Sequence, residues 1–174
     1  VVSINTTTGF VTDDFNQWPV FLKIMIVGIM MIGGCSGSTS GSLKSIRFII
    51  LFKIISRELQ KLVHPRAIFH VKVAGKTIDP DDLANVVALT CLFMGITTLS
   101  CILLSLMGVD FTTAVSASVA SLFNIGPGLG QVGAMGNYAD IPVMGKGIII
   151  SCMLMGRLEI FGFLLLFLPM AWRK

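Results

Sequence analysis

A run of glycine and hydroxyl residues interrupts a long apolar stretch of the chain. Residues 18–57 are apolar on both sides of this run, which occupies positions 33–41. As one helix, residues 18–57 would be about 60 Å long, twice the hydrocarbon thickness of a bilayer. Irregular backbone at membrane depth survives only where protein buries it or where it lines a wet cavity. We therefore predict a spanning helix broken by an intramembrane loop, whose candidate functional residues are Gly33, Gly34, Ser36, Gly37, Ser38, Thr39, Ser40 and Gly41.

The composition indicates that these apolar stretches lie in a membrane. Of the 174 residues, 54% are hydrophobic and 13% are charged, whereas a soluble domain carries about 25% charged residues. The mean hydropathy is +0.87. We therefore expect an all-α integral membrane protein. The chain begins at Val1 and reaches a candidate pore segment almost at once, so we also expect it to be a fragment of a longer protein.

A short run of threonines that ends in a glycine suggests which kind of ligand this membrane protein binds. Glycine permits the positive φ angle that aims successive carbonyl groups at one cation, and threonine adds a hydroxyl oxygen. Taken alone, this segment at 3–10 is more typical of a polar turn. The rest of the chain favours a cation filter, and the candidate filter residues here are Thr6, Thr7, Thr8, Gly9 and Phe10.

The second half of the chain predicts the same order of elements again. Spanning helices are expected at 83–107 and 143–172, and residues 111–123 form a helix of about 20 Å, too short to cross. We interpret this short segment as a re-entrant pore helix that leads into a second filter segment at 124–130. Its candidate filter residues are Asn124, Ile125, Gly126 and Pro127. Gly126 follows Gly9 by 117 residues, so the chain contains two related units.

Basic residues predict the orientation in the membrane. Eight of the 13 lysines and arginines lie between Lys44 and Lys76, and two more close the chain. By the positive-inside rule, the loop at 58–82 and the C-terminus are cytoplasmic. No basic helix face with interleaved aromatic residues is present, so nucleic acid is not an expected partner.

Arg157 lies near the middle of the last predicted helix. An arginine at the centre of a bilayer costs about 2.5–3.5 kcal/mol and needs hydrogen-bond acceptors. Glu159 is two positions away and points in another direction on a helix. Counting from the two filter glycines gives Arg157 the depth of Ser40, so we expect the loop at 33–41 to supply its acceptors, with a local pair with Glu159 as the alternative.

Five motifs together resemble the C-terminal half of the bacterial Trk/Ktr-type potassium uptake proteins, the Trk membrane subunit in particular. They are Thr6-Thr7-Thr8-Gly9-Phe10, the run at 33–41, Leu62-Val63-His64-Pro65, the segment at 124–130 and Gly156-Arg157-Leu158-Glu159-Ile160-Phe161. The resemblance implies helix–pore loop–helix units, four in all, around a central pore. Residues 1–57 would end the third unit and residues 83–174 would form the fourth. The resemblance also implies that the loop at 33–41 blocks the pore below the filter as a gate, with Arg157 as the basic residue at that gate.

These observations lead us to expect potassium transport across the bacterial inner membrane and no enzymatic activity. The bound ligand would be the transported K⁺, with Na⁺ left open, and no covalent cofactor is expected. The resemblance implies three protein partners: the remaining N-terminal half, a second copy in a homodimer, and a cytoplasmic nucleotide-binding regulatory subunit. A cation-coupled secondary carrier, with broken helices and alternating access, is the alternative. The coupling ion stays open.

Overall fold

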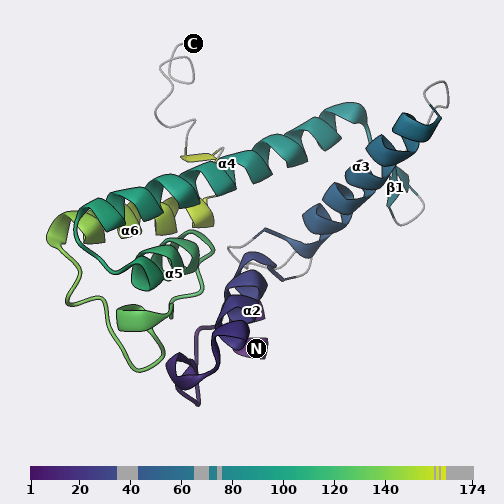
Figure 1. The fold of residues 1–174 in the computed structure, drawn as a ribbon. Coiled ribbons are helices and arrows are strands. Elements are labelled where there is room, and N and C mark those ends of the chain that lie inside the picture. The colour runs from purple at the N-terminus through teal and green to yellow at the C-terminus, as the bar shows by residue number, and fades with distance from the viewer. Residues whose placement is uncertain (35–42, 65–70, 74–75, 159, 161, 164–174) are drawn as a thin grey trace, which may run out of the picture.

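The described part of the chain folds mainly into helices, and it also contains a pair of short strands (Figure 1). The computed structural model describes residues 1–34, 43–64, 71–73, 76–158, 160 and 162–163. Its helices are α1 (Val2–Asn5), α2 (Val20–Met31), α3 (Ser45–Val63), α4 (Pro80–Leu106), α5 (Phe111–Leu122) and α6 (Val143–Arg157), with 3-10 turns η1 (Phe15–Gln17) and η2 (Gly130–Val132). Strands β1 (Lys72–Val73) and β2 (Lys76–Thr77) pair antiparallel. The all-α fold class is confirmed.

The α4 helix has the length and composition of a membrane-spanning helix. Its 27 residues rise about 40 Å. Within the described part of the chain, it is the one helix that is both long enough and apolar enough to cross a bilayer. Only 17% of its apolar window is buried inside the chain. A helix with so much outward apolar surface suits contact with lipid or with further protein.

The α5 helix packs against both α4 and α6, and Figure 1 shows it beside them at one end of the molecule. Asp110 starts it by accepting a hydrogen bond from the Thr112 N–H at 3.1 Å. Three alanines along it are completely buried, namely Ala114, Ala117 and Ala120. Small side chains let neighbouring helices approach closely. After 12 residues α5 ends, so the helix is half-length, as the sequence predicts.

The predicted break lies between α2 and α3, and its described ends are fastened together. The Gly33 N–H donates to the Leu43 carbonyl at 2.9 Å, and the Ser45 N–H donates to the Gly34 carbonyl at 3.1 Å. Ile32 and Leu43 also form an isolated parallel bridge. Of the predicted loop residues, Gly33 and Gly34 belong to this clamp. The others, Ser36, Gly37, Ser38, Thr39, Ser40 and Gly41, lie outside the described residues.

The α3 helix continues beyond the predicted end at residue 57, and this prediction was wrong. α3 runs to Val63, and the hairpin β1–β2 adds structure to the expected loop at 58–82. Glu58 accepts hydrogen bonds from Arg57 at 2.9 Å and from Lys61 at 3.3 Å. Polarity suggested a loop, but glutamate, lysine, arginine, glutamine and leucine all favour helix, so their propensity decides the structure.

The α6 helix also departs from its predicted extent. It begins at Val143, as expected, but ends at Arg157 and not at residue 172, and Leu158 already has a non-helical ψ of 11°. A cation in the last turn faces carbonyl groups that the end of a helix leaves unsatisfied, which stabilises an end at this point. Residues 164–174 lie outside the described part.

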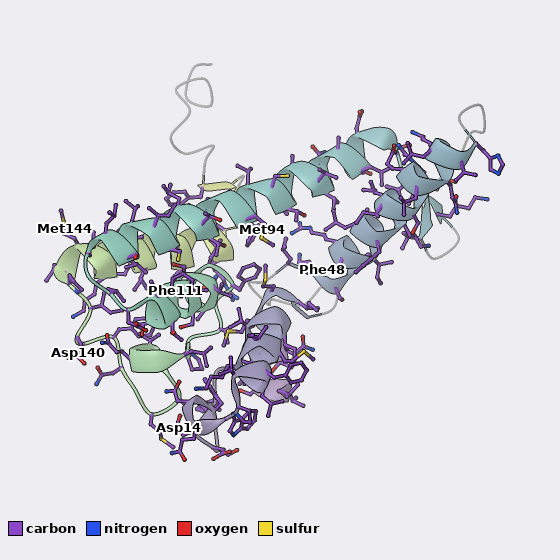
Figure 2. All side chains as sticks on the ribbon, viewed as in Figure 1. Asp14, Phe48, Met94, Phe111, Asp140 and Met144 are labelled. Atoms are coloured by element: carbon purple, nitrogen blue, oxygen red, sulfur yellow. The ribbon has the colours of Figure 1, made fainter. Side chains whose placement is uncertain are left out.

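One apolar core joins the break to both predicted filter segments. Met30 and Leu43, on either side of the break, are 1% and 0% exposed and belong to the same cluster as Ile4, Phe123 and Ile125. The two connectors that lead to α2 and α6 lie at the far end of the molecule from α3, where Figure 2 labels Asp14 and Asp140. The residues beside the clamp therefore share a core with residues of both predicted filter segments.

Candidate functional site

The two predicted filter segments have the same backbone conformation. Thr7 and Asn124 have φ angles of 54° and 55°, and they are the non-glycine residues with positive φ in the described chain. Two positions later, Gly9 and Gly126 have φ angles of 80° and 102°. Each segment thus consists of a left-handed residue, one intervening residue and a glycine. The offset is 117 residues in both cases, which is the repeat that the sequence predicts.

The helix ends that carry these segments are hydrogen-bonded in the same way. After α1, the Thr8 N–H donates to the Ser3 carbonyl at 2.9 Å, and after α5, the Ile125 N–H donates to the Ala120 carbonyl at 2.9 Å. Both bonds belong to the Schellman motif, in which a left-handed residue turns the chain away from a helix. The negative end of each helix dipole therefore lies at the start of a filter segment.

Thr7 holds the strained position in the first segment. Asparagine adopts positive φ readily, but a β-branched residue is an outlier there. Its neighbours on both sides are linked, because the Thr6 and Thr8 hydroxyl oxygens lie 2.8 Å apart in a hydrogen bond. The hydrogen bond between the Thr6 and Thr8 side chains thus spans Thr7, the strained residue.

The two segments touch each other at Gly9. A Cβ atom on Gly9 would lie 2.7 Å from the Ile125 carbonyl oxygen and 3.4 Å from Pro127 Cδ. Real Cβ atoms do not approach a backbone oxygen so closely, so this position requires glycine for space as well as for φ. The filter glycines were expected to gather around one point, and Gly9 does lie against the residue that precedes Gly126.

A cavity of about 360 Å³ opens where the segments meet. Residues 8–11 line one side, residues 125–127 line the other, and the connector before α6 contributes Gly133 and Tyr138. The first segment faces outward, with Phe10 82% exposed, whereas Ile125 in the second is 3% exposed. The second segment is enclosed by its own unit, and the first has a free face.

Hydroxyl side chains of α5 fasten the chain that returns from the second segment. The Ser116 hydroxyl accepts from the Leu129 N–H at 2.8 Å and donates to the Leu129 carbonyl at 3.0 Å. The Thr113 hydroxyl accepts from the Gln131 N–H at 3.2 Å. Buried backbone groups need partners, which explains why a short apolar helix carries several hydroxyls.

Sequence reasoning missed Asn16, which links the two units. Its side-chain amide donates to the Gly130 carbonyl at 3.0 Å and accepts from the Gly130 N–H at 2.9 Å. Asp14 orients this residue by accepting from the Asn16 N–H at 3.0 Å. These hydrogen bonds therefore attach the connector that leads to α2 to the loop that follows the second filter segment.

Tyr138 was missed as well, although a repeat in the sequence points to it. Its hydroxyl donates to the carbonyl of Gly126 at 2.6 Å. The signal is a repeated pattern of an aromatic residue, two variable residues, an apolar residue, proline and valine, at 15–20 and again at 138–143. Phe15 is therefore the counterpart of Tyr138, with an offset of 123 residues.

The same repeat changes the expected level of Arg157. Both spanning helices start with valine after a proline of nearly the same conformation, α2 at Val20 and α6 at Val143. Counted from these starts, Arg157 corresponds in the repeat to Gly34 and not to Ser40, because the second connector is longer than the first. The Arg157 residue is exposed, so this chain does not bury the charge of its guanidinium group.

The residue before Arg157 touches the base of the second filter segment. A Cβ on Gly156 would collide with the Leu122 carbonyl oxygen, the last residue of α5, and would lie 2.5 Å from the Asn124 side-chain nitrogen. The end of α6 can approach this closely only because residue 156 is a glycine. The end of α6 is therefore in direct contact with the base of the second predicted filter segment.

Comparison with known proteins identifies the family. The model of the family TrkH, described as cation transport protein, matches residues 1–174. The chain belongs to the TrkH family. Among curated TrkH-family members, the Trk system potassium uptake protein TrkH of Salmonella typhimurium is 41% identical over 174 residues, and that of Halomonas elongata is 43% identical over 179 residues. Each match covers 100% of this chain and 36% of the relative.

A solved structure agrees with the fold of this TrkH-family chain. The crystal structure of the potassium transporter TrkH from Vibrio parahaemolyticus superposes with a TM-score of 0.89 at 40% identity. The superposition covers 99% of this chain and 36% of that protein. The chain therefore spans about a third of the length of the TrkH-family proteins that it matches.

Proposed function

We propose that this chain supplies two of the filter segments of a potassium transporter. The observation that carries the proposal is the pair of matched segments, each a left-handed residue followed by a glycine, that touch at Gly9 and Ile125. The relatives are named as potassium uptake proteins, and they are longer than this chain. The other two segments would come from the N-terminal half of a longer protein, of which this chain is the C-terminal part.

In this proposal, backbone carbonyls of residues 7–10 and 124–127 replace part of the hydration shell of K⁺. The ends of α1 and α5 support the cation, because each helix C-terminus carries about half a negative charge. Two segments form part of a ring, so this chain alone is not expected to conduct. A secondary carrier with alternating access does not require a half-length helix whose end meets a second, matched segment.

A gate below the filter is the second part of the proposal. The clamp between Gly33 and Leu43 joins the described ends of the break between α2 and α3, and Leu43 packs in the core that also holds Phe123 and Ile125. Arg157, which corresponds to Gly34 in the repeat, would hold the loop at 33–41 in the closed state. Opening would then require the end of α6 and the loop to separate.

The basic end of the molecule is proposed to face the cytoplasm. Lys53, Arg57 and Lys61 lie on α3, at the opposite end of the molecule from the two connectors (Figure 1). By the positive-inside rule this end stays on the cytoplasmic side of the inner membrane. It is also where a cytoplasmic regulatory subunit would dock, and a homodimer would be formed through surfaces of the full transporter.

Substitution of Gly9 tests the filter. In the full-length transporter, we expect Gly9→Ala to reduce Rb⁺ uptake at least about tenfold, because a Cβ would meet the Ile125 carbonyl at 2.7 Å and the φ of 80° is unfavourable for alanine. Gly28→Ala is the matched control, since residue 28 lies in α2 with nothing within 4 Å of an added Cβ. Normal uptake by Gly9→Ala, with normal amounts of protein in the membrane, would refute the filter.

A further inference from the structure

The second filter segment accepts a hydrogen bond from an aromatic residue, Tyr138, whose counterpart in the first unit lacks a hydroxyl. The Tyr138 hydroxyl donates to the Gly126 carbonyl at 2.6 Å. At the equivalent place before α2, the chain has Phe15, which has no hydroxyl. The two units thus share an aromatic position before the spanning helix, but only the aromatic residue of the second unit carries a hydroxyl, which bonds to a filter carbonyl.

Tyr138 is fixed well enough to position that carbonyl. Its ring packs against the core cluster that includes Leu104, Val132 and Ile141. Burial raises the pKa of the phenol, and a side-chain hydrogen bond with Ser121 opposes this in smaller measure. The phenol therefore remains protonated at neutral pH and can act as a donor.

The Gly126 carbonyl can serve both the hydroxyl and an ion. A carbonyl oxygen has two lone pairs, and the Tyr138 hydroxyl occupies one of them. Tyr138 and Gly126 both line the 360 Å³ cavity where the segments meet, so the bonded carbonyl belongs to a residue at that cavity. The hydrogen bond limits how far this oxygen can move towards a bound cation.

We propose that the Tyr138 hydroxyl is a positioning group that holds the Gly126 carbonyl and thereby favours K⁺ over Na⁺. Selectivity in carbonyl filters depends on cavity size and on the number and field strength of the coordinating dipoles. An oxygen that moves freely can close around the smaller Na⁺, and an oxygen without a donor presents a stronger field to it. The hydroxyl opposes both effects. This inference rests on the proposed function.

The test compares K⁺ and Na⁺ in the full-length transporter carrying Tyr138→Phe. We measure the concentrations of K⁺ and of Na⁺ that half-inhibit Rb⁺ uptake and take their ratio. Loss of one hydrogen bond is expected to lower the preference for K⁺ about two- to tenfold while Rb⁺ uptake persists. Thr98→Val is the matched control, because it removes a hydroxyl that bonds to the Met94 carbonyl on the exposed side of α4.

Restoration of a donor separates positioning from general damage. Para-aminophenylalanine at position 138 returns an N–H donor to the same place and is expected to restore the ratio. An unchanged ratio in Tyr138→Phe, or a lowered ratio that the amino group fails to restore, overturns the inference and leaves the filter proposal standing. A wild-type transporter that shows no K⁺ preference contradicts the proposed function, and the inference fails with it.

Discussion

Arg157 is the residue on which the proposed gate depends. It closes the last turn of α6, directly after Gly156, whose missing side chain lets the helix approach the Leu122 carbonyl and the Asn124 side chain. The same helix end is therefore in contact with the base of the second predicted filter segment, and by the repeat Arg157 corresponds to Gly34 of the clamp. The proposed gate would couple the two through this residue.

Replacement of Arg157 tests this coupling. We expect Arg157→Ala to increase Rb⁺ flux through the full-length transporter several-fold, because the loop loses the cation that holds it across the pore. Arg157→Lys keeps the charge but lacks the planar fork of donors, so an intermediate flux is expected. Equal or lower flux in Arg157→Ala, at normal expression, would rule out the gate.

The elements are held in register by contacts between units. α5 packs on α4 and α6, while α2 reaches α5 through the core around Ile26, Met30 and Phe123. The connector before α2 is joined to the second unit by the two hydrogen bonds between Asn16 and Gly130. These bonds hold the connector that follows the first predicted filter segment against the end of the second.

Asn16→Ala should loosen that junction. Each hydrogen bond contributes about 0.5–1.5 kcal/mol, so we expect a loss of about 1–3 kcal/mol in the free energy of unfolding. The midpoint of thermal unfolding of the purified transporter should fall accordingly. Gln17→Ala is the control, since the neighbouring amide side chain is exposed. Equal unfolding temperatures for Asn16→Ala and Gln17→Ala would mean that the Asn16–Gly130 hydrogen bonds contribute nothing to the free energy of unfolding.

Local chemistry explains which features could be predicted from the sequence. The break at 33–41, the half-length α5 and the positive φ of Gly9 and Gly126 all follow from short-range requirements of length, polarity and backbone freedom. The contacts of Asn16 and Tyr138 join residues that are 114 and 12 positions from their partners, and no hydropathy pattern encodes them. The ends of α3 and α6 were misplaced because hydropathy alone does not locate a helix terminus.

At the scale of the whole molecule, the proposed function requires one ion site that both units share. The chain is a third of its relatives' length, and the outward face of the first segment, with Phe10 82% exposed, is where further segments of the longer protein would lie. The matched helix ends of α1 and α5 would then be two of several directed at one axis. Under the proposed function, ion binding would belong to the assembled pore and not to either unit alone.

The most direct test is to locate the ion in the full-length transporter. Anomalous scattering from crystals that contain Rb⁺ or Tl⁺ should show a peak in contact with backbone oxygens of residues 7–10 and of residues 124–127. Replacing Rb⁺ with Na⁺ should weaken or shift the occupancy of that site. A transported ion that binds elsewhere in the protein, with no density between these two segments, would contradict the account.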